Sequence, residues 1–162
     1  MQVDERHSPR DELSRWIFNF LVVPLSPLTH FAPRSLINDR NFEAAFSIVL
    51  GNSDVELLSW LCSQLRPEDV FSGSPLAMGQ EVILSLAQQL GCDLHRDPSV
   101  KAVWIRDAVL ALNCSDPLLL PHIQAVLSDL YAQLEHEALE CEGSAQSELR
   151  LCMRVIKTQL RG

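Results

Sequence analysis

Apolar residues recur every three to four positions from Phe42 to Leu160, which is the spacing of one face of an α-helix. No stretch alternates apolar and polar residues for long, and no Asn-Gly hairpin turn is present. The pattern therefore predicts an all-α chain whose helices are joined by short loops. The predicted helices cover residues 42–50, 53–65, 82–94, 100–112, 116–138 and 149–160.

Turn and cap residues set the expected helix boundaries. Gly51 is a natural stop for the first helix. Ser53 and Glu56 have the spacing of a capping box, in which each side chain accepts from a backbone N–H. Pro67 is expected to close the second helix, and Pro98 to stand in the first turn of the fourth. Because consecutive amphipathic helices tend to stack antiparallel, the predicted fold is an α-α superhelix, although no repeat signature is present.

The N-terminal part of the chain does not follow this pattern. Residues 1–10 are polar and aperiodic and are predicted to be a disordered N-terminus. Residues 11–35 combine a partial helix with a proline-rich apolar stretch, and residues 36–162 form the predicted helical domain. The apolar run Trp16–Leu25 is too short to span a bilayer, and the segment before it is too acidic for a signal peptide. A cytosolic location is therefore expected, with no membrane partner.

Charge is unevenly distributed along the chain. The formal net charge is −8; residues 1–40 balance, with five basic and five acidic side chains, whereas residues 41–162 carry eight basic and sixteen acidic ones. A protein that binds nucleic acid needs a basic face to neutralise phosphates. Direct binding to a nucleic-acid backbone is therefore not expected.

The cysteines indicate a reducing compartment. There are five of them, an odd number with wide spacing, which does not resemble a disulfide framework. Cys62 lies in the middle of a predicted helix beside Trp60, with no glycine elbow, and so is expected to pack in the core and not to act as a nucleophile.

Cys92 and His95 are the nearest approach to a metal-ligand pair. Zinc usually takes four ligands from the protein in a structural site, and a second pair at the required spacing is absent. We expect a buried thiol beside a surface histidine. His136 lies between Glu135 and Glu137, where a solvated, charged helix face is expected in place of acid–base chemistry.

These observations predict a chain with no catalytic, cofactor-binding or metal site. Gly-rich phosphate loops are also absent. The chain is thus expected to be an interaction domain and not an enzyme. A hydrolase or metal-dependent helical enzyme that uses Cys62, Cys92 or His95 is the alternative from another class.

Three large aromatic residues fall in the helical region. Trp104 and Tyr131 are expected to anchor the core. Trp60 lies off the line of Leu57 and Leu61, so it either seals a neighbouring helix or stands in a surface groove. Burial is favoured, because helices in a superhelix are covered on two sides.

Several strings, in order, resemble one family. They are SDVELLSWLCSQL (53–65), LSLAQQLGCDL (84–94), KAVWIRDAVLALNCSDP (101–117) and ELRLCMRVIKTQL (148–160). They resemble the C-terminal domain of the enhancer-of-mRNA-decapping scaffold, which is called Varicose in plants. The resemblance covers about residues 36–160, and residues 59–64 are most similar to the plant branch.

The resemblance implies a fold and a function. It implies an armadillo- or HEAT-like stack of helices in a non-catalytic scaffold of cytoplasmic processing bodies (P-bodies). Members of the family bring the decapping enzyme and its activators together, which promotes removal of the 5′ cap and mRNA decay. Full-length members also carry a WD40 propeller and a low-complexity linker, so this chain is expected to be a C-terminal fragment or a truncated product.

The chain departs from the family pattern at one place. In the family, the equivalent of residues 13–15 runs almost directly into the equivalent of Leu36, whereas here residues 16–35 intervene. They are apolar and proline-rich. We interpret them as an insertion, of which translated intron sequence is one source, within what would be a single helix.

Four residues are predicted to bind protein partners. Arg150 matches a basic position of the family's last helix, and with Arg154 and Lys157 it forms an i, i+4, i+7 basic stripe; Trp60 is the fourth. Cations near a helix C-terminus also stabilise the helix dipole, so a purely structural role for the stripe is the alternative. The expected partners are the decapping enzyme, its activators or other mRNA-decay proteins, and self-association is a further option. A helical oligomerisation or adaptor module outside RNA decay remains an alternative function.

Overall fold

The computed structural model describes residues 31–73 and 76–161, and within them it contains helices and loops but no strand. This confirms the predicted all-α class. The helices are α2 (Phe31–Asn38), α3 (Phe42–Gly51), α4 (Val55–Gln64), α5 (Pro67–Phe71), α6 (Gln80–Gly91), α7 (Pro98–Ala111), α8 (Leu120–Glu140) and α9 (Gly143–Arg161).

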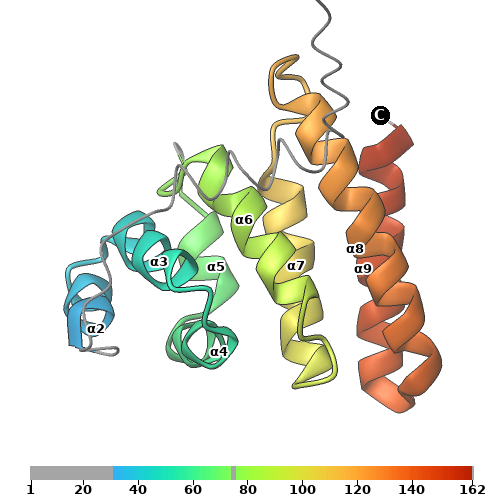
Figure 1. Ribbon diagram of the computed structural model, residues 1–162, viewed down its shortest axis with the longest axis horizontal. Coiled ribbons are helices and arrows are strands. Elements are labelled where there is room, and N and C mark those ends of the chain that lie inside the picture. The colour runs from blue at the N-terminus through green and yellow to red at the C-terminus, as the bar shows by residue number, and fades with distance from the viewer. Residues whose placement is uncertain (1–30, 74–75, 162) are drawn as a thin grey trace, which may run out of the picture.

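The helices stack in two layers along the chain (Figure 1). In one layer α3 packs on α6 and α6 on α8; in the other α5 packs on α7 and α7 on α9. The pairs α6–α7 and α8–α9 join the two layers, and α2 packs on α3 at the N-terminal end. Each helix thus contacts its neighbours in the stack, which confirms the predicted α-α superhelix.

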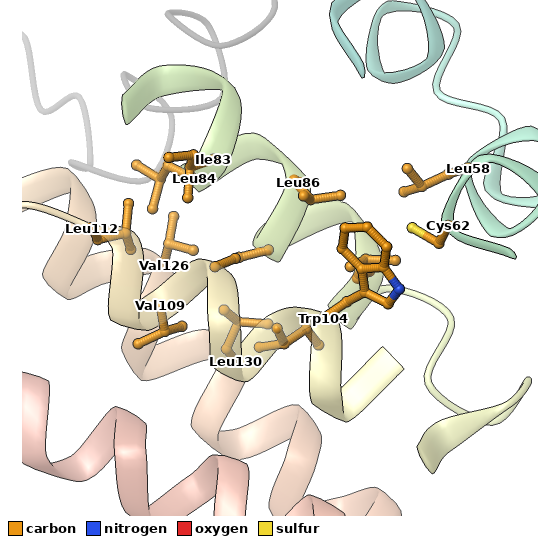
Figure 2. Packing of buried hydrophobic residues seen from close by; sticks show 14 of the residues in the cluster. Leu58, Cys62, Ile83, Leu84, Leu86, Trp104, Val109, Leu112, Val126 and Leu130 are labelled. Atoms are coloured by element: carbon orange, nitrogen blue, oxygen red, sulfur yellow. The ribbon is translucent and has the colours of Figure 1, made fainter. Parts of the chain in front are cut away.

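The core is apolar and continuous, and Trp104 packs in it near Cys62 (Figure 2). Its side chain is 2% exposed. The Trp104 ring centroid lies 5.9 Å from that of Phe46 on α3 and 6.1 Å from that of Phe71 on α5, so one side chain joins three helices. Tyr131 is half-buried against the same core. The predicted anchoring role of Trp104 is confirmed.

The cap of α4 differs from the prediction by one residue. Asp54, not Ser53, is the N-cap, and its Oδ1 accepts hydrogen bonds from the backbone N–H of Glu56 at 2.9 Å and of Leu57 at 3.1 Å. Ser53 instead has φ 52°, in the turn after α3. The expected Ser53–Glu56 capping box is therefore wrong, because a carboxylate at position 54 can accept from two free N–H groups of the first turn.

Two prolines begin helices that the sequence pattern placed differently. Pro67 follows the end of α4, as expected, but it also occupies the first turn of the short α5, which was not predicted. The long helix α8 begins at Leu120 with Pro121 in its first turn, and not at Asp116. Five residues are too few for a helical period to show, and any proline near a helix start suits the first turn equally well.

The predictions for the N-terminus are only partly covered by the structure. Residues 1–30, which include the expected disordered end, the partial helix and the run Trp16–Leu25, lie outside the described residues. Helix α2 begins at Phe31, inside the predicted insertion, and continues past Leu36. The boundary at residue 36 remains a prediction. Among the described residues, no helix combines the length and the apolar character needed to cross a membrane.

Candidate protein-binding surfaces

Helix α9 presents cations on one side and apolar residues on the other. Arg150, Arg154 and Lys157 are all exposed, and within the described part of the chain none of them forms an ion pair. Leu149 and Ile156 are fully buried on the opposite side. The predicted stripe therefore exists as a free, solvated row of charge, which we call the basic edge.

Trp60 lies on a different part of the molecule. It is half-buried on α4 and packs partly against the core, and the Cζ atom of Arg34 on α2 lies 5.7 Å from its ring centroid. This distance allows a cation–π interaction between α2 and α4. Since α4 packs on α3 and α6 while α9 packs on α7 and α8, Trp60 and the basic edge do not form one surface (Figure 1).

A groove between α4 and α7 was not predicted from the sequence. It has a volume of about 520 Å³, and Pro67 at the start of α5 also lines it. Its floor and walls are Ser59, Cys62, Ser63, Leu65, Pro67, Leu90, Asp97, Val100, Lys101, Val103 and Trp104. Val100, which the helical period assigned to the core, is 51% exposed on one wall.

The groove could be suspected from α7 itself. Its apolar positions surround most of the helix: Val103 and Leu110 fall away from the buried Trp104 and Ala108, whereas Val100 lies one turn before Trp104 on the same side. A helix at the surface of a small domain needs only one apolar stripe. The additional apolar residues indicate that α7 has a second apolar face.

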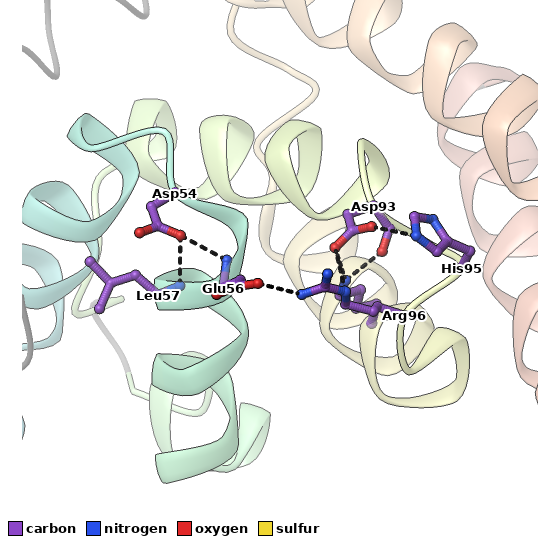
Figure 3. A network of polar contacts seen from close by, with 7 residues as sticks. Asp54, Glu56, Leu57, Asp93, His95 and Arg96 are labelled. Atoms are coloured by element: carbon purple, nitrogen blue, oxygen red, sulfur yellow. Dashed lines mark hydrogen bonds and ion pairs between the residues drawn. The ribbon is translucent and has the colours of Figure 1, made fainter.

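A polar cluster lies behind the groove and ties α4 to the loop between α6 and α7 (Figure 3). Buried Lys101 donates to the backbone oxygen of Asp93 and lies 3.3 Å from its Oδ2, while His95 Nε2 lies 3.2 Å from Asp93 Oδ1. Arg96 Nη1 donates to Glu56 Oε1 on α4 at 3.1 Å. Asp93 thus neutralises the only buried cation of the described residues, which is the arrangement a buried charge requires.

Cys62 lies in the wall between the groove and the core, close to Trp104 (Figure 2). Burial raises the pKa of its thiol to about 12, although the charge of Lys101 acts in the opposite direction. A nucleophilic cysteine needs a lowered pKa, so this thiol stays protonated and inert at neutral pH. The expectation that Cys62 packs in the core is confirmed.

The structure brings together Cys92, His95 and His136, which the sequence analysis had considered separately. With Glu137 and Glu140 they line a shallow hollow of about 550 Å³ between the end of α6 and α8. Within the described residues, no three such side chains are grouped closely enough to hold a metal ion. His136 and His95 are exposed, as expected.

The expectation of a buried Cys92 is wrong. Cys92 follows the last residue of α6 and is exposed, with its thiol directed to the backbone oxygen of Gln88 at 3.4 Å. The helical period had continued through residue 94, but the helix stops at Gly91. Gly91 is buried and an added Cβ would lie 2.5 Å from atoms of Leu130 and Gln133, so α6 ends where it packs tightly on α8.

Comparison with known proteins agrees with this architecture. The family model for the C-terminal part of enhancer of mRNA-decapping protein 4 matches residues 34–153. The human protein of that name is 30% identical over 127 residues and the one from Xenopus laevis 31% identical over 127 residues; these alignments cover 76% and 78% of this chain. The Drosophila melanogaster homologue is 27% identical over 126 residues, or 77% of this chain. Each alignment spans about 9% of the relative's own length.

A solved structure has the same fold. The crystal structure of the conserved C-terminal region of Ge-1 superposes with a TM-score of 0.72 and 26% identity, and the match covers 80% of this chain and 97% of that one. The nearness to the plant branch stays a prediction. With a family model that spans most of its length and a matching helical stack, the chain belongs to the family of the C-terminal region of enhancer of mRNA-decapping protein 4.

Proposed function

We propose that this domain is a protein-interaction module of an mRNA-decapping scaffold, which promotes removal of the 5′ cap and directs the protein to P-bodies. The membership of the family supports this proposal. The observation that carries it is the basic edge of α9, a row of cations that no described residue neutralises in a domain with a large acidic excess. The domain acts by binding, and its partners are proteins of the decapping machinery.

The basic edge is suited to an acidic partner. One side of α9 is buried in the core, and its exposed side carries Arg150, Arg154 and Lys157. The backbone of the helix therefore holds the three cations in a row. Rows of this kind increase the association rate and select partners of opposite charge. Trp60 is proposed as a second contact, on the α2–α4 side of the domain, for a different partner or a different part of the same one.

Charge reversal tests the proposal. We expect the full chain with Arg150→Glu and Arg154→Glu, fused to a fluorescent protein, to lose its enrichment in P-bodies and its capture of decapping factors from cell extract. Arg66→Glu makes one such reversal at the residue before α5, where Arg66 pairs locally with Asp69 at 3.3 Å, and should leave both properties intact. Circular dichroism must show that the double variant is folded.

The outcomes separate the alternatives. Normal P-body enrichment of a folded double variant would reject the basic edge as the binding surface. If the unaltered chain itself retrieves no decapping factor but assembles with other copies or with unrelated proteins, the domain is an adaptor outside RNA decay and the proposal fails.

A further inference from the structure

We propose that the groove between α4 and α7 binds a short apolar segment of another protein that carries Lys or Arg beside its apolar residues. This inference rests on the proposed role of the domain in protein interaction, but it concerns a surface other than the basic edge. Helix α7 separates the two, because α4 and α5 line one side of the groove and α9 packs on the far side of α7.

The apolar part of the groove is large enough for several side chains. Cys62, Leu90 and Trp104 line it, and each is almost wholly buried. Val100 and Val103 on α7 and Pro67 at the start of α5 also line it. A volume of about 520 Å³ lies within the range of pockets that enclose most of a small ligand. An apolar face of this kind loses contact with water only when a partner covers it.

A hydroxyl group on the groove wall has no partner. The Oγ of Ser59 is buried and forms no hydrogen bond with any residue that the structure describes. Ser63, one turn later on the same wall, instead donates to the backbone oxygen of Trp60 at 2.6 Å. Unsatisfied buried polar atoms are uncommon in folded proteins, but this oxygen lies beneath the groove surface and so does not select the partner.

The charges at the groove favour a cationic partner. Lys101 lines the groove, but its ammonium is held by Asp93. Asp97 at the same end is exposed, makes no cap hydrogen bond to α7 and forms no ion pair with the described residues. The groove therefore offers one carboxylate that forms no ion pair within the described part of the chain, although its charge also acts on neighbouring Arg96, which is already paired with Glu56 and Asp93.

The charge of the domain as a whole has the same sign. Four of the eight basic residues of the segment 41–162 lie on α9, whereas fifteen of its sixteen acidic residues lie elsewhere. A segment with Lys or Arg would thus approach a negative field, which increases the association rate and excludes acidic competitors.

Two synthetic peptides of equal length test the proposal on the full chain. The probes are fluorescein-labelled KLAALLAK and ELAALLAE, which share every apolar residue and differ only in the sign of the end charges. Fluorescence anisotropy should show that the cationic peptide binds at least about tenfold more tightly at low salt, a difference that salt reduces. Methyl NMR should place the shifts at Val100 and Val103.

Matched variants distinguish binding in the groove from nonspecific hydrophobic binding. Val100→Ser should weaken the cationic peptide at least about fivefold, because an exposed apolar contact is lost. Leu118→Ser removes a side chain that is 82% exposed outside the groove and should change nothing. Asp97→Asn retains a residue that tolerates the left-handed backbone at φ 50° and should clearly reduce the preference for the cationic peptide.

Several results would overturn the proposal. Equal binding of both peptides to the unaltered chain, no binding of either, or shifts at Leu118 in place of Val103 would do so. A concentration-dependent dimer that Val100→Ser abolishes would assign the groove to a second copy. Changes at the Val100 and Val103 methyl groups in a Phe18→Ser, Phe20→Ser variant would assign it to the chain's own apolar run. P-body enrichment in the double variant of the basic edge does not affect these readouts.

Discussion

Lys101 and the cations of α9 occupy opposite environments in the same domain. Lys101 is 4% exposed, and its ammonium is held by the backbone oxygen and the carboxylate of Asp93. Arg150, Arg154 and Lys157 are exposed and, within the described residues, form no ion pair. The first charge stabilises the fold where α6 turns into α7, whereas the others contribute little to it.

The difference shows where charge is available for recognition. A buried charge must be paired, so its energy depends on the partner that it already has. An exposed charge keeps its water and gains from a partner that approaches later. Stability and binding should therefore respond to different substitutions in the two regions.

The largest expected effect is on the thiols. Because burial raises the pKa of Cys62 to about 12, iodoacetamide at pH 8 should alkylate it roughly a thousand-fold more slowly than an ordinary thiol. Exposed Cys92 should react faster than Cys62, although burial and the charge of Asp93 also raise the pKa of its thiol. Mass spectrometry of the digested protein measures both rates, and in denaturant the difference should disappear. Equal rates in the native protein would show that burial does not protect the Cys62 thiol.

The same shift makes stability depend on alkaline pH. The pKa of Cys152 is also raised to about 12 by burial, so the unfolded chain releases both thiol protons before the folded one does. The contribution of these thiols is complete below pH 9 and is lost as the pH rises towards 12. Urea midpoints measured across this interval should fall, and less so in a Cys152→Ala variant relative to its own value at pH 8.

Loss of the buried cation should lower the free energy of unfolding more than any surface substitution does. Lys101→Ala leaves Asp93 in a buried site without its main partner and should lower the free energy of unfolding by about 3 kcal/mol. Lys157→Ala is the same chemical change on the basic edge and should alter it by less than about 0.5 kcal/mol. Urea denaturation compares the two; similar losses would remove the distinction between the regions.

The N-cap of α4 should have a smaller effect. Asp54→Ala removes the acceptor for two backbone N–H groups and should cost about 1 kcal/mol. Asp54→Asn keeps an acceptor and should cost clearly less. If both variants lose the same stability, the charge of Asp54, and not its hydrogen bonds, stabilises the helix.

The smallest stability effect is expected at the basic edge. Arg150→Glu with Arg154→Glu should change the free energy of unfolding by less than about 0.5 kcal/mol, although it should abolish partner capture. Thermal or urea unfolding of the purified double variant provides the measurement. A large loss of stability would show that these arginines serve the helix and not a partner.

Helical periodicity was enough to place most of the core. Leu57, Leu61, Leu149 and Ile156 follow the expected stripes and are buried, because a helix that packs on one side needs apolar residues at that spacing. Val100 fits the same pattern but is exposed. Periodicity identifies which residues share a face; it does not show which of two apolar faces is covered.

Only one of the two candidate surfaces could be predicted from the sequence. The basic edge depends on one helix, so the spacing of Arg150, Arg154 and Lys157 was sufficient to predict it. The groove combines α4, the start of α5 and α7, and its charge depends on Asp93 holding Lys101 while Asp97 forms no ion pair with the described residues. No pattern within a single helix shows how these helices and charged residues are arranged relative to one another.

The sequence by itself determined the all-α class, the order of most helices and the exposed row of cations, because these depend on contacts within a turn or two of one chain segment. Only the tertiary structure decided which apolar faces are covered, that Cys92 is exposed while Cys62 is sealed, and that a groove remains between α4 and α7. Those outcomes depend on how closely helices distant in sequence approach one another, as at Gly91 and α8, and that distance is set by packing.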